Sequence, residues 1–201
     1  MPSQEAIDRS RRTIASYEGF AAEYNDIVGP APSADEEAGL RRLMDVVGPG
    51  GSILEIGSGP GRDADFLESL GAVVRRTDAT RRFLELQAER GRHGDLLNVL
   101  TDELGGPYRG VLALCVLIHI ERQNIDEVLG RIAAALQPGG AFLVSMREGA
   151  GVTDGDYLTT YWTGPEFVAR LEAAGLRVDW RNHHVDSGGD PWLTFLAVRP
   201  A

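Results

Sequence analysis

The sequence predicts an α/β protein with a mostly parallel sheet, helices on both faces and an antiparallel hairpin at its end. From residue 52 onward, short apolar runs with the length of buried strands alternate with segments of helical periodicity, as is typical of parallel sheets. The last two strand candidates are separated only by the loop 186–190, so they must be antiparallel. A length of 201 residues suits one compact domain.

The N-terminal region predicts helices before the first strand. Apolar residues recur at helical spacing over residues 4–28, which indicates one or two helices. The segment 29–32 contains two prolines and interrupts them, because each proline disfavours helix in the residue before it. Ser33 and Glu36 form a capping box, so a further helix is expected from Ser33 to Gly48.

Strands and helices then alternate to the end of the chain. Strands are expected at 53–56, 72–77, 111–117, 141–146, 177–183 and 192–198, with a weaker candidate at 91–93. Helices are expected at 63–70, 80–90 and 125–136, and at 163–174, where Thr163 and Glu166 form a second capping box.

Composition excludes several classes of partner. Asp and Glu total 30 against 20 Lys and Arg, a formal charge of -10, so we expect neither nucleic acid nor anionic membrane as a partner. The N-terminus lacks the apolar stretch of a secretory signal, and no apolar run is long enough to span a membrane. The single Cys115 allows no internal disulfide, so we expect a cytoplasmic protein. The neighbouring His183 and His184 point to opposite faces of a strand, so we expect no metal site.

One loop concentrates the chemistry. The segment from Glu55 to Gly61 leaves a buried strand and enters a helix, with glycine at every second position from 57. Glycine permits positive φ and the close approach of a ligand, and the helix N-terminus behind the loop offers unpaired N–H groups. Asp78 ends the next strand, where a carboxylate can accept both hydrogen bonds of a ribose diol. These residues indicate a nucleoside site.

Two other interpretations fit the same residues. The loop can be a tight turn with a helix cap and no ligand. A nicotinamide site requires G-x-G-x-x-G/A, which is met when the count starts at Gly59 and ends at Ala64. Counting from Gly59 leaves Gly57 without a role in the motif. Counting from Gly57 instead places Arg62 at the third position, where the motif requires glycine or alanine.

The segment 53–61, Ile-Leu-Glu-Ile-Gly-Ser-Gly-Pro-Gly, resembles the first motif of class I S-adenosylmethionine-dependent methyltransferases, of the small bacterial type that acts on small molecules. The resemblance continues at Gly94 and Asp95, at His119, and at the turn 137–140. Arg109 departs from it, since the family usually has an acidic residue at that point. The resemblance implies a Rossmann-like sheet of seven strands with the last strand antiparallel.

The resemblance also implies how S-adenosylmethionine would be bound. The loop glycines would lie beside its methionine part, with Glu55 ordering the loop or binding the amino group. Asp78 would accept from the ribose hydroxyls, and Asp95 from the adenine amino group. Arg62 would meet the carboxylate or remain solvated. The expected cofactor contacts are Glu55, Gly57, Ser58, Gly59, Gly61, Arg62, Asp78, Asp95, Leu96, Tyr17 and Tyr24.

Methyl transfer from a sulfonium depends on alignment and exclusion of water, and it needs a base only when the acceptor keeps its proton. His119 lies just past a central strand and has an unperturbed pKa near neutrality, so it is the candidate base; its alternative role is structural. The expected substrate contacts are Arg147, Glu148, Tyr157, Tyr161 and Trp162. For these, a solvated ion pair and ordinary packing remain alternatives.

The N-terminal region often lies over the cofactor in the related enzymes. Tyr17, Phe20 and Tyr24 recur at helical spacing, so we interpret residues 1–48 as a helical lid and 49–201 as the cofactor-binding domain. A stripe facing the core is the alternative for these aromatic residues.

The sequence therefore predicts a methyltransferase that uses S-adenosylmethionine, releases S-adenosylhomocysteine and methylates an oxygen or nitrogen, with carbon as a further option, of a small molecule. We expect a monomer or homodimer. Two alternatives stay open: a non-catalytic protein or regulator that binds S-adenosylmethionine, and an NAD(P)-dependent oxidoreductase.

Overall fold

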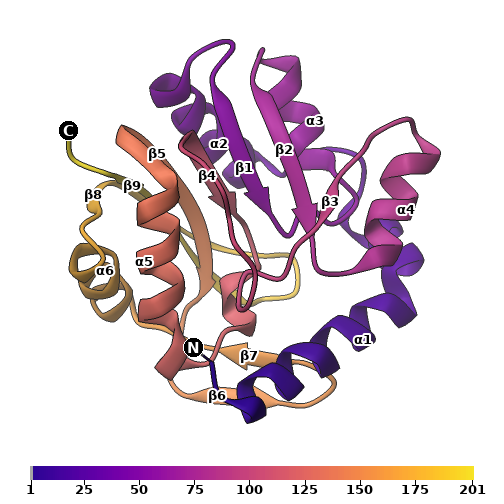
Figure 1. The fold of residues 1–201 in the computed structure, drawn as a ribbon. Coiled ribbons are helices and arrows are strands. Elements are labelled where there is room, and N and C mark those ends of the chain that lie inside the picture. Colours follow the sequence, from indigo (N-terminus) through magenta and orange to yellow (C-terminus); the bar gives the residue numbers. More distant parts are fainter. Residues whose placement is uncertain (1) are drawn as a thin grey trace.

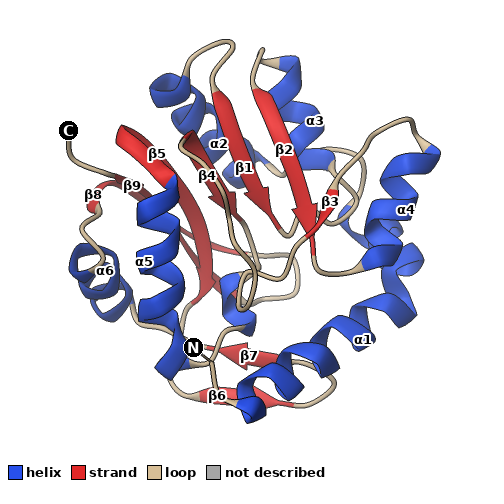
Figure 2. Ribbon diagram, in the orientation of Figure 1, coloured by secondary structure: helices blue, strands red, loops and turns tan. Residues whose placement is uncertain are grey.

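The computed structural model describes residues 2–201 and contains a seven-stranded sheet in the order β3-β2-β1-β4-β5-β9-β8 (Figures 1 and 2). Its strands are β1 (Ser52–Ile56), β2 (Val73–Asp78), β3 (Asp95–Leu96), β4 (Tyr108–Ala113), β5 (Leu136–Arg147), β8 (Arg177–Val185) and β9 (Pro191–Val198). The first five are parallel, and β9 is antiparallel to both β5 and β8. The predicted sheet, with its reversed last strand, is confirmed.

The helices begin and end close to their expected positions. They are α1 (Gln4–Val28), α2 (Ala34–Val47), α3 (Arg62–Ser69), α4 (Arg81–Glu89), α5 (Ile125–Ala135) and α6 (Gly164–Ala173). Both capping boxes are present, at Ser33 with Glu36 and at Thr163 with Glu166. The segment 4–28 is one helix with a break at Phe20, where φ is -129° and ψ is 16°.

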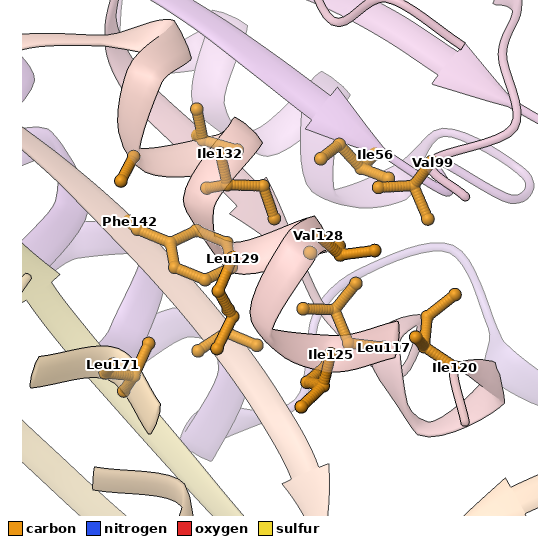
Figure 3. Close-up of a cluster of buried hydrophobic side chains, with 14 of the residues drawn as sticks. Ile56, Val99, Leu117, Ile120, Ile125, Val128, Leu129, Ile132, Phe142 and Leu171 are labelled. Atoms are coloured by element: carbon orange, nitrogen blue, oxygen red, sulfur yellow. The ribbon is translucent and has the colours of Figure 1, made fainter. Parts of the chain in front are cut away.

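Two hydrophobic layers cover the sheet, because successive strand residues point to opposite faces. Ile53 and Leu143 face α2 and α3, whereas their neighbours Leu54 and Phe142 face α5 and α6. Figure 3 shows side chains of α5 grouped around Phe142. Helix α2 thus belongs to the packed body of the protein, and within the proposed lid segment 1–48 only α1 extends away from the sheet (Figure 1).

The strand order reverses direction at β1. The chain moves from β1 to β2 and β3 on one side, and β4 and β5 lie on the other. In such sheets ligands bind beyond the carboxyl ends of the strands at this reversal. Figure 1 shows that α1 and a small hairpin lie on that side of the sheet, so these elements enclose the expected binding position.

The sequence prediction was wrong at two strands. The weak candidate at 91–93 is a turn, and the third strand is the short β3. The strand expected at 111–117 ends at Ala113, because Cys115 takes a left-handed conformation with φ of 60° and its N–H donates to Ser145 Oγ (2.8 Å). The chain then turns through a 3-10 helix, Leu117–His119.

A hairpin not predicted from the sequence lies beside α1. Its strands are β6 (Val152–Asp154) and β7 (Leu158–Thr160), in the polar stretch expected to be a loop. Three-residue strands carry too little periodicity to be recognised. Arg12 of α1 pairs with Asp154, and the Leu158 N–H donates to Thr13 Oγ1 (3.5 Å), so the hairpin holds α1 in place.

No helix within residues 2–201 is long and apolar enough to cross a membrane.

Packing around Phe142 gives a test of the fold. Phe142 is fully buried between the sheet and α5. Phe142→Ala should lower the free energy of unfolding by about 3–5 kcal/mol, measured by urea denaturation. Val73→Ala, at a side chain that is 62% exposed, serves as the control and should change it by less than about 0.5 kcal/mol. A small effect at Phe142 would contradict the two-layer packing.

Candidate functional site

A cavity of about 120 Å³ lies at the carboxyl ends of β1, β2 and β4. Its walls come from α1, the loop after β1, the end of β2, the segment after β3 and the segment 114–120. Ligand sites for drug-sized molecules usually enclose about 300–1,000 Å³. Because α1 forms one wall, an outward movement of α1 is the simplest way for this cavity to admit a larger ligand.

The glycine loop makes the floor of the cavity. Gly57 has φ of 69°, and a Cβ there would lie 2.3 Å from Val116 Cγ2, so no larger residue fits between the loops that follow β1 and β4. Gly59 also has positive φ and lines the cavity. Gln87 of α4 holds the loop from behind, because its Nε2 donates to Ser58 Oγ (2.8 Å) and to the Gly59 carbonyl (2.7 Å).

Asp78 stands at the end of β2 with both oxygens engaged. Oδ2 accepts from the Gly59 N–H (2.8 Å) and Oδ1 from the Thr80 N–H (2.7 Å). Burial nevertheless raises the pKa of this carboxyl to about 6, against the opposing effect of those hydrogen bonds. Each oxygen keeps further acceptor capacity, so the group can still bind a diol in the cavity.

Two more buried carboxyl groups flank the loop. Glu55 Oε2 and Asp63 Oδ1 have no hydrogen-bond partner, although the Arg62 Nε lies 3.4 Å from that Asp63 oxygen. Burial raises the pKa of Asp63 to about 7 and the pKa of Glu55 well above its usual value, and in Glu55 the nearby Asp63 adds to this. A cationic group bound nearby would stabilise the ionised form of these acids.

His119 is fixed on two sides. Its Nδ1 lies 2.6 Å from the Leu158 carbonyl oxygen, which can only accept, so Nδ1 carries the proton. Nε2 therefore accepts from the Tyr17 hydroxyl (3.1 Å). Burial lowers the pKa of His119, whereas the bond to Leu158 partly opposes that change. The lone pair of Nε2 is thus directed toward Tyr17 of α1.

Aromatic side chains of α1 cover the cavity. The Tyr17 ring lies 6.1 Å from Phe83 of α4 and 5.5 Å from His119, and Tyr24 lies 5.5 Å from Phe83. Glu18 accepts from the first N–H groups of α4, at Arg81 (2.6 Å) and Arg82 (3.0 Å). These contacts hold α1 against the cofactor side of the sheet.

The structure brings together six of the residues expected at the site. They share the cavity wall: Gly57, Gly59, Asp78, Tyr17, Tyr24 and His119. Tyr157 joins them through ring contacts with Tyr17 (5.7 Å) and His119 (5.4 Å).

Several expected cofactor residues lie outside the cavity wall. Ser58 and Gly61 face Gln87 behind the loop. The Arg62 guanidinium donates to the Val28 carbonyl (2.7 Å) and pairs with Glu36, so it joins the ends of α1 and α2. Asp95 pairs with Arg75, and Leu96 is exposed, whereas the next residues, Leu97 and Asn98, line the cavity. The segment after β3 thus meets the cavity about two residues later than the resemblance implied.

The expected substrate residues other than Tyr157 are engaged elsewhere. Arg147 pairs with Asp186 and Asp190 in the β8–β9 loop, and Glu148 lies 2.8 Å from His183 Nε2. Trp162 is fully buried under Arg122 and forms core. Tyr161 lies 3.3 Å from Thr153 Oγ1 in the small hairpin.

Sequence reasoning missed Phe83, which lines the cavity, and Gln87, which holds the glycine loop from behind. The two lie four residues apart on one face of α4, and that spacing was the available signal. Cys115 was expected inside a strand but lines the cavity, where burial raises the pKa of its thiol to about 12. Nothing in the local sequence marks its left-handed conformation. Within residues 2–201, no three His, Cys, Asp or Glu side chains gather as metal ligands would.

No family model matches the chain, and no curated protein matches it. Solved structures do match. A 1,6-didemethyltoxoflavin N1-methyltransferase of Burkholderia thailandensis, with bound 1,6-didemethyltoxoflavin and S-adenosylhomocysteine, superposes with a TM-score of 0.82 at 20% identity, over 100% of this chain and 93% of its own. The N-methyltransferase NodS of Bradyrhizobium japonicum, with bound S-adenosylhomocysteine, gives 0.76 at 16% identity over 94% and 100%. The [4+2]-cyclase SpnF gives 0.73 at 13% identity over 93% and 94%.

These likenesses establish the fold. The chain has the Rossmann-like fold of class I S-adenosylmethionine-dependent methyltransferases, as its sequence motifs predicted. One neighbour is named as a cyclase, so the reaction has to be argued from the site itself.

The raised pKa of Asp63 gives a pH-dependent test. A carboxyl whose pKa is higher in the folded than in the unfolded chain holds more protons when folded, so its contribution to the free energy of unfolding falls as pH rises from about 4 to about 7. Asp63→Asn has no titrating carboxyl at this position, so its free energy of unfolding does not include this fall with pH. Relative to wild type, the variant should gain about 1 kcal/mol or more between pH 4 and pH 8, measured by urea denaturation.

Asp45→Asn, at an exposed residue of α2, is the matched control and should show no such trend. If the difference between Asp63→Asn and wild type stays constant with pH, Asp63 titrates like an exposed carboxyl.

Proposed function

We propose that this protein is an S-adenosylmethionine-dependent methyltransferase that acts on a small-molecule acceptor. One observation carries the proposal: three carboxyl groups with buried oxygens, Glu55, Asp63 and Asp78, surround a glycine loop in which residue 57 has no room for a side chain. A cationic nucleoside complements that arrangement. S-adenosylmethionine, when bound, supplies an activated methyl group on a sulfonium centre.

The same charges argue against a dinucleotide. A pyrophosphate needs positive potential at the helix N-terminus that follows the glycine loop. Here Asp63 and Asp65 lie in the first turn of α3, and Gly61 packs against Arg76 and Gln87 instead of facing the cavity. The acidic first turn would repel a pyrophosphate, so a nicotinamide cofactor is the weaker candidate.

The residues that line the cavity define how the cofactor would be held. Asp78 accepts from the ribose hydroxyls, and the backbone at Gly57 and Gly59 lies along the amino-acid part. Glu55 and Asp63 do not line the cavity, and they would stabilise the positive charge of the cofactor from behind the glycine loop. Leu97 and Asn98, in place of the expected Asp95 and Leu96, meet the adenine. Tyr17 and Tyr24 close over the site from α1.

The chain contributes alignment, exclusion of water and one proton acceptor. Helix α1 and the rings of Tyr17, Tyr24 and Phe83 cover one side of the cavity and limit the access of water, which favours an in-line displacement. His119 Nε2 holds a lone pair in the cavity wall, so it can take the proton of an acceptor. Methylation of oxygen, nitrogen or carbon is compatible with this arrangement.

The proposal extends to the setting of the enzyme. The excess of acidic residues and the single cysteine support a cytoplasmic protein that does not act on nucleic acid or at a membrane. Both named methyltransferase neighbours reported above have small molecules or their analogues bound. We include a monomer or homodimer in the proposal, since nothing in the site requires a second copy.

Substitution of Asp78 tests the cofactor site. Asp78→Asn replaces a carboxylate that would accept from the ribose, so the affinity for S-adenosylhomocysteine should fall about 5- to 150-fold in isothermal titration calorimetry. Asp45→Asn should bind like wild type. Unchanged affinity in Asp78→Asn would show that the nucleoside binds elsewhere, and stabilisation by NADH in place of S-adenosylhomocysteine would favour the oxidoreductase.

A screen of a metabolite library with methyl-labelled S-adenosylmethionine tests the reaction itself. We expect label in a small-molecule product. Binding of S-adenosylhomocysteine with no transfer to any acceptor would favour the non-catalytic alternative.

A further inference from the structure

The acceptor end of the cavity has a definable chemistry. This inference rests on the proposed function and concerns the class of molecule that is methylated. Its evidence is the surroundings of His119, which include α1, the small hairpin and the segment 114–120.

The Tyr17 side chain already places a planar, uncharged ring against the base. Its hydroxyl lies 3.1 Å from His119 Nε2, with the two rings steeply inclined at 70°. Tyr17 stacks with Phe20 (5.2 Å, 26°) and with Tyr157 (5.7 Å, 26°). Tyr17 and Tyr157 both contact the His119 ring, and a flat molecule with an O–H or N–H at its edge matches the geometry of Tyr17.

Anionic groups find no partner in this cavity. Among the described residues that line it, none is Lys or Arg. Arg62, expected at the cofactor carboxylate, pairs with Glu36, and Arg147, expected at the substrate, pairs with Asp186 and Asp190. A carboxylate or phosphate of the acceptor beside His119 would lose its hydration with no cation to compensate. The carboxylate of the cofactor belongs to its amino-acid part, which the proposal places along the glycine loop.

Neutral hydrogen-bonding groups are present instead. Ser10 Oγ accepts from Asn98 Nδ2 (2.9 Å), and Thr13 Oγ1 lies 3.5 Å from the Leu158 N–H. Both hydroxyls line the cavity and keep a proton to donate, which suits ring carbonyls or ring nitrogens.

The basicity of His119 restricts the acceptor further. Burial keeps its imidazole neutral and lowers its pKa, so it is a weak base. An alkylammonium nitrogen has no lone pair until its proton has left, so it would need full deprotonation by this weak base first. A ring N–H or phenolic O–H can pass its proton to His119 as the new bond forms.

We infer that the acceptor is an uncharged, planar heteroaromatic or phenolic molecule whose ring N–H or O–H displaces the Tyr17 hydroxyl from His119 Nε2. In the transfer, the acceptor atom bonds to the methyl carbon while the carbon–sulfur bond breaks and its electron pair goes to sulfur. The acceptor proton passes to His119 Nε2, which leaves a methylated acceptor, S-adenosylhomocysteine and a protonated imidazole that releases its proton to solvent.

Matched probes test the charge and shape of the acceptor. Three pairs differ by one carboxylate: uracil and orotate, lumazine and 6-carboxylumazine, catechol and 3,4-dihydroxybenzoate. Calorimetry with the full-length protein saturated with S-adenosylhomocysteine should show binding of at least one uncharged member, with its carboxylated partner at least about tenfold weaker. Equal or tighter binding of the carboxylated members would overturn the inference.

The cofactor measurement separates this inference from the proposed function. If S-adenosylhomocysteine itself does not bind, the proposed function fails. If it binds and none of the uncharged probes does, the proposed function stands and the inference on the acceptor is overturned.

Two variants locate the probe beside His119. Tyr17→Phe removes the competing hydroxyl and keeps the ring, so the bound probe should gain affinity about threefold to tenfold. His119→Asn keeps a donor for the Leu158 carbonyl and removes Nε2, so probe affinity should fall about tenfold while affinity for S-adenosylhomocysteine is retained. His93→Asn, at an exposed histidine, is the control and should bind like wild type.

Weaker probe binding in Tyr17→Phe would overturn the displacement, because it would mean that the hydroxyl holds the acceptor. If His119→Asn does not fold, Tyr17→Phe and the paired probes still decide the question.

Discussion

The loops that leave β1 and β4 pass so close together that residue 57 has no space for a side chain. A Cβ on Gly57 would overlap Val116 Cγ2, and Val116 in turn is positioned by the left-handed turn at Cys115. This contact fixes where the glycine loop can lie. From it follow the hydrogen bond of Gly59 to Asp78 and the position of the 3-10 turn that carries His119. The geometry of the candidate site is therefore a consequence of the strand order, since only adjacent β1 and β4 bring these loops together.

The carboxyl groups around the glycine loop lower the stability of the protein and favour the binding of a positively charged ligand. Glu55 and Asp63 each bury an oxygen without a hydrogen-bond partner, and Asp78 is buried beside them. A fold selected for stability alone would exclude or pair such groups. Their presence is understandable when a positively charged ligand completes the site, and local conflicts of this kind are characteristic of functional regions.

Much of the fold was predictable because its signals are local. Capping boxes at Ser33 and Thr163, glycine after helices and short apolar strands each depend on a few neighbouring residues. The positions of Asp78 and the glycine loop were also predictable from the sequence, because both lie at the ends of strands and therefore at the same edge of the sheet. The errors concern tertiary contacts. The partners of Arg62 and Arg147 come from distant segments, and the early end of β4 depends on Ser145 in the next strand. Spacing in the sequence carries no information on such contacts.

The break at Phe20 divides α1 between Tyr17, which contacts His119, and Tyr24, which packs on Phe83. Glu18 attaches the middle of α1 to α4, and Arg62 attaches its end to the start of α2. The N-terminal half has a separate anchor, because Arg12 and Thr13 contact the small hairpin. For the proposed methyltransferase the consequence is kinetic: opening of the hairpin contacts alone would let acceptor and methylated product exchange while the nucleoside stays in place.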